Sequence, residues 1–297
     1  MKFGTPIAMI DPEFYLPLVQ AAEAAGFDTI AVPDSIAYPR ESSNTYPYNF
    51  DGTREFLENK PFIEPTVAIA AMGAVTSTIE FHTFVVKLPI RNPVVYAKEI
   101  SSLAVMTGNR FVLGVGSSPW PDDYEITNLP WEGRGRRFDE CIEVIRGLCA
   151  GGYFEFHGEC YDFPAIKMLP VPTAPVPILV GGHGDVNLRR AARIGDGWMS
   201  AGDTIEGVTE KLARIDDYRK EYGTTGPGRT GRFDVYATTL ESFSADGIKR
   251  LEDLGVTHTS GGFSGFNPYG AEADSESLQD KIDALNRYSD EVISRVR

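Results

Sequence analysis

The sequence predicts one α/β domain over residues 1–297, a single (β/α)8 barrel of the TIM type with insertions. Eight short apolar runs alternate with longer segments in which apolar residues recur at helical spacing. The length suits one barrel with insertions, and neither a repeat nor a linker divides the chain. The longest polar loops follow the second, fourth and eighth runs, and so share the carboxyl face on which such barrels build active sites.

The predicted strands and helices alternate along the whole chain. The strands are expected at Lys2–Met9, Phe27–Val32, Ile79–Val86, Phe111–Val115, Pro177–Val180, Asp196–Ser200, Phe233–Thr239 and Gly255–Ser260. Proline and capping residues indicate where several helices start, as at Asp11-Pro12 and Asn92-Pro93, and Asp185 is expected to cap the sixth. The helices are expected to begin near Pro12, Pro65, Pro93, Arg134, Asp185, Ile205, Ser244 and Leu278.

The stretch from Arg110 to Cys149 contains the clearest β-to-α unit. Its apolar run is short and β-rich, as in a fully buried strand, and it breaks at Gly116-Ser117-Ser118-Pro119. A polar loop with two tryptophans follows. The next segment is amphipathic, with apolar residues at helical spacing and charged residues between them. The unit therefore has an unusually long loop at the carboxyl end of its strand.

Two insertions interrupt the alternation of strands and helices. Ser35–Ile63 is long and irregular, which in a compact domain indicates function or disorder; its aromatic residues favour a packed lid. These aromatics are Tyr38, Tyr46, Tyr48, Phe50 and Phe56. Gly151–Ala174 contains an expected hairpin that turns at His157-Gly158. An aromatic-lined carboxyl face suits a flat organic ligand.

Composition excludes several classes of function. The formal net charge of −14 argues against nucleic acid or an anionic membrane as a partner. Three cysteines without motif spacing are typical of reduced thiols in a cytoplasmic protein. The first residues predict a strand and not a signal peptide, and no run reaches the length of a membrane span. No pair of histidines or carboxylates has metal-ligand spacing, so no metal is expected.

Several segments between about Ala21 and Trp198 occur in the order found in one known superfamily. They include AAEAAGFDTIAVPDS, LPIRNPVVYAKEISSLAVMTGNRFVLGVG, PWEGRGRRFDECIEVIRGL, FHGECYDF, PILVGG and LRRAARIGDGW. Together they resemble the luciferase-like monooxygenase superfamily, in particular its branch that uses the deazaflavin coenzyme F420. The resemblance implies a barrel that holds a tricyclic ring at its carboxyl face.

The resemblance also implies where the cofactor lies. Thr83, Phe84 and Val85 would contact it, with a non-proline cis peptide bond near Phe84-Val85 supporting the ring. The backbone of Gly181, Gly182, His183 and Gly184 would cradle a phosphate ahead of a helix, although a tight strand-to-helix turn is the alternative.

Other residues near these strand ends have two possible roles each. Gly116 and Ser117 could approach the cofactor closely, or simply form the strand exit. Lys87 and Arg91 could offset an anionic cofactor tail, and solvation at the surface accounts for them equally well.

The proton-transfer groups of many relatives are missing from this sequence. Where relatives carry Asp-His after the second strand, this chain has Asp34-Ser35. Some deazaflavin relatives place a glutamate after the glycines of the fourth strand, where this chain has Ser117-Ser118-Pro119. Asp34, Ser35, Tyr48 and His183 are the candidate proton-transfer groups, with Asp34 also near the cofactor. Tyr48 and Trp120 are the candidate substrate contacts.

The sequence therefore predicts a cytoplasmic, F420-dependent oxidoreductase that transfers a hydride between C5 of the deazaflavin and a small organic substrate. We expect a homodimer, as in many relatives. The alternatives are an FMN-dependent luciferase-like monooxygenase on the same scaffold and a cofactor-binding barrel without turnover. A sugar-phosphate lyase or isomerase is disfavoured because neither a Schiff-base lysine nor a metal set stands near the strand ends.

Overall fold

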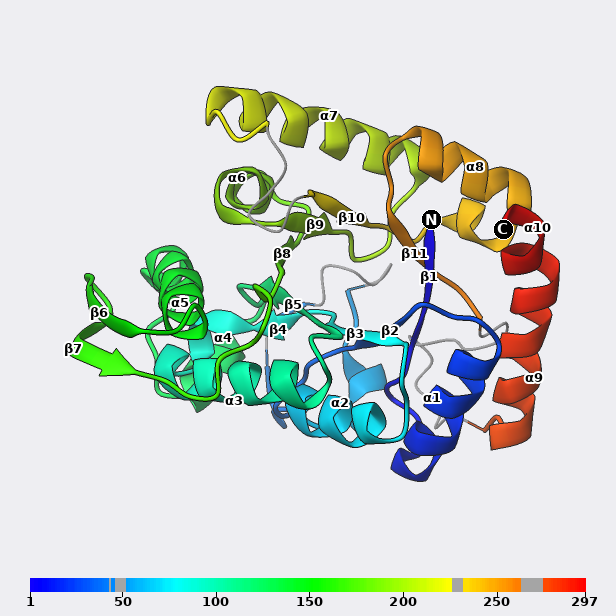
Figure 1. The fold of residues 1–297 in the computed structure, drawn as a ribbon, viewed down its shortest axis with the longest axis horizontal. Coiled ribbons are helices and arrows are strands. Elements are labelled where there is room, and N and C mark those ends of the chain that lie inside the picture. Colours follow the sequence, from blue (N-terminus) through cyan, green and yellow to red (C-terminus); the bar gives the residue numbers. More distant parts are fainter. Residues whose placement is uncertain (43, 46–51, 226–231, 263–274) are drawn as a thin grey trace.

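The computed structural model describes residues 1–42, 44–45, 52–225, 232–262 and 275–297 (Figure 1). Its main sheet is parallel throughout and closes into a barrel. The strands that form it are β1 (Lys2–Pro6), β2 (Thr29–Val32), β3 (Glu80–Thr83), β4 (Val86–Lys87), β5 (Phe111–Gly116), β8 (Ile178–Gly181), β9 (Gly197–Met199), β10 (Asp234–Tyr236) and β11 (His258–Ser260).

Closure of the barrel follows from the pairing order. The strands run β3-β2-β1-β11-β10-β9-β8-β5-β4, and β3 also pairs with β5, with Phe81 opposite Phe111. β3 and β4 form one position in the ring, so the barrel has eight positions, as the sequence predicts. The predicted fold class is confirmed.

The third strand position is interrupted by the cis peptide bond between Phe84 and Val85. β3 pairs with the start of β5 and β4 with its end, where Val86 lies opposite Val115. The expectation of one continuous strand over Ile79–Val86 is therefore wrong, because the chain leaves the ladder at the cis bond. The cis bond itself, implied by the family resemblance, is confirmed at the predicted residues.

Helices surround the barrel (Figure 1). They are α1 (Tyr15–Ala24), α2 (Pro65–Ala74), α3 (Pro93–Met106), α5 (Arg134–Cys149), α6 (Asp185–Ile194), α7 (Ile205–Glu221), α8 (Ala245–Asp253) and α9 (Leu278–Tyr288), which a π-helical turn (Ser289–Ile293) and α10 (Ser294–Val296) continue. Side-chain caps start several of them: Asn92 Oδ1 accepts from the N–H groups of Val94 and Val95 at the start of α3.

Two helix starts differ from expectation. Gly184, and not Asp185, is the N-cap of α6; the Asp185 carboxylate instead accepts from Arg189 Nε at 2.9 Å. The loop after β5 also contains an unpredicted short helix, α4 (Pro121–Ile126). Its sequence carried a signal, because proline at the first position and two aspartates in the first turn are typical of a helix start.

Two apolar regions hold the barrel together. The larger lies between the strands and the helices and includes Phe81, Phe138 and Leu188, each fully buried. The smaller lies among residues of the barrel strands: Val112, Leu179, Met199 and Tyr236, with Phe84 and Val85 packed against them. Complete burial of one such side chain contributes roughly 1.5–3 kcal/mol.

The predicted hairpin is confirmed as β6 (Tyr153–His157) paired with β7 (Asp162–Lys167), but its turn spans residues 158–161, because His157 still pairs with Asp162. It projects from the barrel beside α5 (Figure 1). The Glu140 carboxylate fixes its turn by accepting from the N–H groups of Glu159, Cys160 and Tyr161 at 2.9–3.1 Å.

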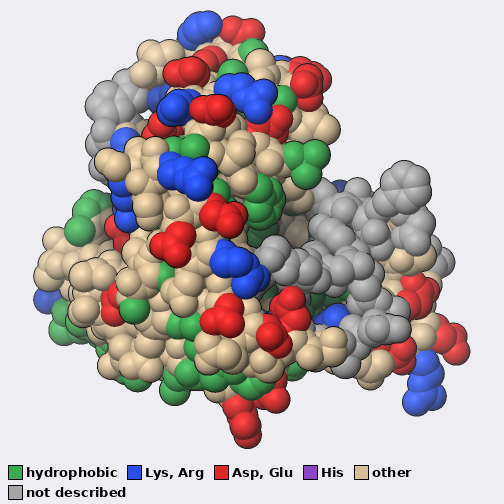
Figure 2. All heavy atoms as spheres, turned by 90° about the vertical axis from the view of Figure 1, so that its right-hand side faces the viewer, with side chains coloured by type: hydrophobic (Ala, Val, Ile, Leu, Met, Phe, Trp, Pro, Cys, Tyr) green, Lys and Arg blue, Asp and Glu red, His purple; other side chains and the backbone are tan. Residues whose placement is uncertain are grey.

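Two further observations concern the surface. Acidic and basic side chains are intermixed on the face shown in Figure 2. Within the described residues, no helix is long and apolar enough to cross a membrane.

Candidate functional site

A pocket of about 550 Å³ opens at the carboxyl ends of the barrel strands. That volume lies within the range of roughly 300–1,000 Å³ found for small-molecule sites. Every position of the barrel contributes to its wall at or just beyond its strand. The contributing residues are Pro6, Ser35, Val85, Gly116, Gly181, Met199, Thr238 and Ser260.

Val85 lies between two glycines of the pocket wall. A Cβ atom on Gly116 would lie 2.7 Å from Val85 Cγ2, and one on Gly181 would lie 2.9 Å from Val85 Cγ1. Glycine is therefore required on both sides of the Val85 side chain. Phe84, Val85, Gly116, Ser117 and Gly181 all line the pocket, as expected for cofactor contacts.

Thr83 does not line the pocket. Its side chain is fully buried, and its hydroxyl donates to the Gly114 carbonyl at 2.7 Å and accepts from the Gly114 N–H at 2.9 Å. Thr83 therefore joins β3 to β5 behind the wall. A direct cofactor contact at Thr83 does not fit this geometry.

The glycine-rich turn after β8 contributes only its first half to the pocket. Gly181 and Gly182 line it, whereas His183 and Gly184 do not. Gly182 has a positive φ of 115°, and a Cβ there would lie 2.4 Å from Asn187 Nδ2. Asn187 stands in the first turn of α6 and lines the pocket, a contact that the sequence analysis missed.

His183 supports the neighbouring strand end. Its Nε2 accepts from the Ala201 N–H at 3.1 Å and lies 3.1 Å from Ser200 Oγ. Burial lowers the pKa of His183; the charge of Lys211 lowers it further, and the charge of Asp203 raises it by less than burial lowers it. The His183 ring is therefore neutral near pH 7, and it holds the chain just after β9. Because it does not line the pocket, its place does not favour proton exchange with a ligand there.

Asp34 lines the pocket but its carboxylate is fully engaged. Arg91 donates to both oxygens, at 2.8 and 3.0 Å, and the Lys87 backbone N–H donates to one of them at 3.0 Å. The Asp34 side chain is only 2% exposed. Arginine and carboxylate groups favour this two-point pairing. The Asp34 carboxylate therefore has a structural role and is not a free base. Ser35, beside it, is half-buried in the pocket wall.

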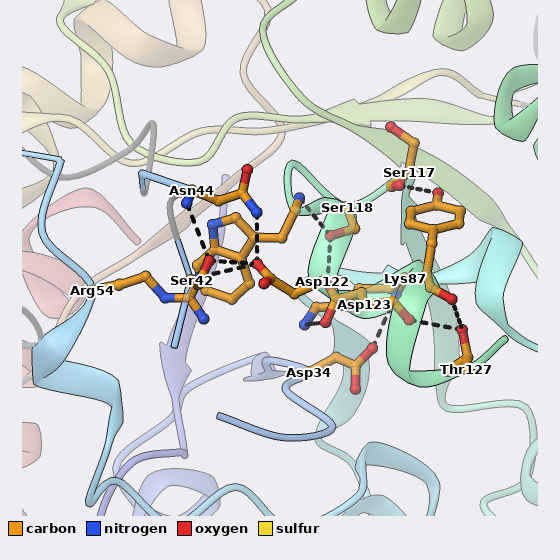
Figure 3. A network of polar contacts seen from close by, with 12 residues as sticks. Asp34, Ser42, Asn44, Arg54, Lys87, Ser117, Ser118, Asp122, Asp123 and Thr127 are labelled. Atoms are coloured by element: carbon orange, nitrogen blue, oxygen red, sulfur yellow. Dashed lines mark hydrogen bonds and ion pairs between the residues drawn. The ribbon is translucent and has the colours of Figure 1, made fainter. Parts of the chain in front are cut away.

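A second charged pair, formed by Lys87 and Asp123, lies at the wall between β4 and α4 (Figure 3). Lys87 Nζ lies 3.0 Å from Asp123 Oδ1, and both residues are buried. The Ser118 hydroxyl donates to the other carboxylate oxygen and accepts from the Trp120 N–H. Lys87, Ser118 and Trp120 all line the pocket. Surface solvation of Lys87, one of the two open possibilities, is therefore wrong.

Trp120 connects the pocket to the loop after β2. Its ring lies between Lys87, 5.1 Å from the ring centroid, and Arg54, 4.7 Å from it. Arg54 also donates to Asp122, whose Oδ2 accepts from Ser42 and Asn44 as well (Figure 3). Of the predicted aromatic lid, Phe56 lines the pocket, while Tyr46, Tyr48 and Phe50 lie outside the described residues.

Across the parts of the chain that the structure describes, no group of three or more histidine, cysteine, aspartate or glutamate side chains is arranged to hold a metal ion.

A family model described as luciferase-like monooxygenase matches residues 4–280. The chain belongs to the luciferase-like monooxygenase family. An uncharacterized protein of Mycobacterium tuberculosis is 52% identical over 296 residues, which cover 100% of each chain. The F420-dependent glucose-6-phosphate dehydrogenase of Gordonia bronchialis is 29% identical over 218 residues, 71% of this chain and 60% of that enzyme.

The fold of this family member also matches a solved structure. The crystal structure of monooxygenase RslO1 from Streptomyces bottropensis superposes with a TM-score of 0.77, at 16% sequence identity and with 100% of both chains covered. At that identity the match supports the barrel alone. The barrel is thus of the luciferase-like type.

The family member's pocket contains charged groups that sequence reasoning did not place. Arg91 lies 57 positions from Asp34 and Asp123 lies 36 positions from Lys87, so neither pair was identifiable from spacing. Both cations and Asp34 were noticed, but Asp123 and the two pairings were not. Only the closed barrel brings the residues after β2, β4 and β5 to one wall.

Proposed function

We propose that this protein is an F420-dependent oxidoreductase that transfers a hydride between the deazaflavin and a small organic substrate. The observation that carries the proposal is the wall of Phe84, Val85, Gly116 and Gly181 at one side of a largely apolar pocket. The 29% identity to an F420-dependent enzyme of Gordonia bronchialis supports the choice of cofactor.

The residues of the pocket fit a flat tricyclic ring. The glycines at the ends of β5 and β8 keep side chains off the wall around Val85, so a ring can lie against backbone and Val85 together. Asn187 and the backbone of the glycine turn would orient the polar tail at the start of α6. Trp120, Phe56 and Phe62 would cover the pocket and exclude water.

When bound, the deazaflavin supplies hydride chemistry at C5, and the substrate carbon is reduced as the cofactor is oxidised, or the reverse. The chain's own task is to hold ring and substrate in contact. Ser35 occupies the place of the histidine found in many relatives, and Asp34 is paired with Arg91. The proposal therefore assigns proton transfer to neither of them.

The proposal is tested by titrating the purified protein with F420 and separately with FMN, following fluorescence quenching. We expect micromolar binding of F420 and negligible binding of FMN. Gly181→Ala should weaken F420 binding because its Cβ would meet Val85. Gly184→Ala is the matched control, because a Cβ there meets nothing within 4 Å.

The other outcomes separate the alternatives. A preference for FMN, with oxygen consumption, would replace the proposal with a luciferase-like monooxygenase. Tight F420 binding without turnover of any substrate tried would favour a cofactor-binding barrel. Binding of neither cofactor would remove both enzyme proposals.

We further propose a homodimer. Large apolar side chains are exposed on consecutive helices α1, α2 and α3: Leu16, Val67, Val95 and Met106. Exposed apolar side chains that together form a patch mark protein–protein interaction sites, and a second copy of the chain would cover these four. Light scattering after size-exclusion chromatography should give twice the mass of one chain, and a monomer at micromolar concentration would refute the proposal.

A further inference from the structure

We infer that the substrate is uncharged and carries one oxygen acceptor, as in a ketone or the matching alcohol, and that Lys87 binds this oxygen. The inference names the substrate class for the proposed function and therefore rests on it. It also states which substrates are disfavoured beside Lys87, namely phosphorylated and carboxylated ones; the anionic tail of F420 itself would lie at the start of α6, away from Lys87.

Lys87 has hydrogen-bonding capacity directed to the pocket wall. An ammonium group has three N–H donors. Asp123 accepts one of them at 3.0 Å, and the Trp120 ring lies 5.1 Å from Nζ. Lys87 is a lining residue of the pocket, and its ammonium has more donors than its one side-chain hydrogen bond uses. A ligand oxygen would take up remaining donor capacity at this buried position.

The charge around Lys87 selects against anions. Among the described lining residues, Lys87 and Asp34 are the only ionisable ones, and each is paired, with Asp123 and Arg91 respectively. The pocket thus contains a donor without net positive charge. Transfer of an anion into such a site costs free energy that no unpaired cation offsets.

The rest of the wall favours an apolar body on the substrate. Pro6, Ala8, Met9, Phe62 and Met199 are among its lining residues. One polar anchor in an apolar pocket fixes the orientation of a ligand. Hydride transfer to the carbon next to the anchored oxygen converts a ketone to an alkoxide, and the Lys87 ammonium donates the proton that completes the alcohol and regains it from solvent; oxidation of the alcohol runs the same steps in reverse.

The test compares three probes of one shape: cyclohexanone, cyclohexanecarboxylate and cyclohexyl phosphate. Their dissociation constants are measured by ligand-observed NMR on the protein with and without F420. For the wild type we expect cyclohexanone to bind at least about tenfold more tightly than either anion. Equal or tighter binding of an anion would overturn the inference.

Asp123→Asn gives the sharpest variant. It leaves the Lys87 ammonium unpaired, so the ratio of carboxylate to ketone affinity should rise by about tenfold or more. Asp122→Asn is the matched control, because this neighbouring residue pairs with Arg54 and not with Lys87. An unchanged ratio in Asp123→Asn would mean that the pair is only structural.

A double variant removes the charge altogether. Lys87→Met alone would leave Asp123 buried without its partner, so Lys87→Met is combined with Asp123→Asn, and folding is checked by thermal melting. This variant should bind cyclohexanone at least about tenfold more weakly than the wild type. Unchanged ketone binding would refute the role of Lys87.

The two proposals fail separately. If F420 does not quench, the proposed function fails, while the probes still report on Lys87 in the cofactor-free protein. If F420 binds but the anions bind best, only the substrate class is wrong.

Discussion

The mouth and the interior of the barrel both avoid net charge, but in different ways. At the mouth, opposite charges pair: Asp34 with Arg91, and Lys87 with Asp123. In the interior, Tyr236 stacks on His258 with ring centroids 3.9 Å apart, and His82 meets Tyr236 edge to face with ring centroids 4.8 Å apart. In the described part of the chain, His82 Nδ1, the Tyr236 hydroxyl and His258 Nε2 are buried without a hydrogen-bond partner.

Burial keeps His82, Tyr236 and His258 in their uncharged forms. It lowers the pKa of His82 to about 3, and together with the nearby His82 it lowers that of His258 to about 2. Burial also raises the pKa of Tyr236 well above its usual value. The interior is therefore uncharged at pH 7, whereas the mouth keeps full charges that cancel. Only the mouth retains a charged donor for a ligand.

Breaking a pair at the mouth should have the largest effect on stability. Arg91→Met removes both donors of the bidentate pair and leaves the Asp34 carboxylate, 2% exposed, with one backbone partner. We expect a loss of about 3–5 kcal/mol in the free energy of unfolding. Urea denaturation followed by circular dichroism measures it.

An exposed ion pair provides the control for Arg91. Arg136 and Glu159 lie 2.9 Å apart with side chains 58% and 72% exposed, so Arg136→Met should cost only about 0–1 kcal/mol. Equal losses in the two variants would mean that burial does not distinguish the mouth from the surface.

Lowering the pH should reduce the folding stability through the buried histidines of the interior. The unfolded chain takes up protons on histidine below its ordinary pKa of 6.5, whereas folded His82 and His258 resist protonation until much lower pH. Their contribution to stability is complete above pH 6.5 and is lost as the pH falls. Between about pH 6.5 and 4.5 the loss should be roughly 2–3 kcal/mol per histidine.

His82→Phe isolates this effect because it keeps a ring against Tyr236 and removes the titrating group. Its melting temperature should fall less than that of the wild type between pH 7 and pH 4.5. His157→Asn removes an exposed histidine whose pKa the neighbouring Asp162 raises, so it should not reduce the loss of melting temperature that the wild type shows in acid. Parallel slopes for wild type and His82→Phe would contradict the assignment.

The same contrast separates what the sequence could predict from what it could not. Apolar runs predict buried strands, so the strand at Phe111–Val115 differs from β5 by one residue, and the stretch at Tyr153–Asp162 predicts the hairpin. These features depend on local periodicity and turn chemistry. The cis bond at Phe84–Val85 followed from the family resemblance.

The pairs at the mouth depend on barrel closure, which no local pattern encodes. The strands of the carboxyl-terminal half were also predicted too long: Phe233–Thr239 became Asp234–Tyr236. Its ladder with β9 ends at Tyr236 opposite Met199, after which the chain turns away to form the pocket wall at Thr238. A strand end is set by its neighbours, and these are known only once the sheet order is known.

The smallest effect concerns the outer edge of the mouth, where Arg54 and Asp122 lie 3.0 Å apart. Burial raises the pKa of Asp122, but hydrogen bonds from Asn44, Ser42 and Arg54 outweigh it and lower the pKa overall. Because Asn44 and Ser42 remain as donors, the coupling between Arg54→Met and Asp122→Asn in a double-mutant cycle should be only about 0.5–1 kcal/mol. Urea denaturation of the four proteins measures it. Arg54 is itself only 5% exposed, so a coupling as large as the loss in Arg91→Met would mean that Ser42 and Asn44 do not compensate for its removal, and would erase the distinction between the two neighbouring aspartates.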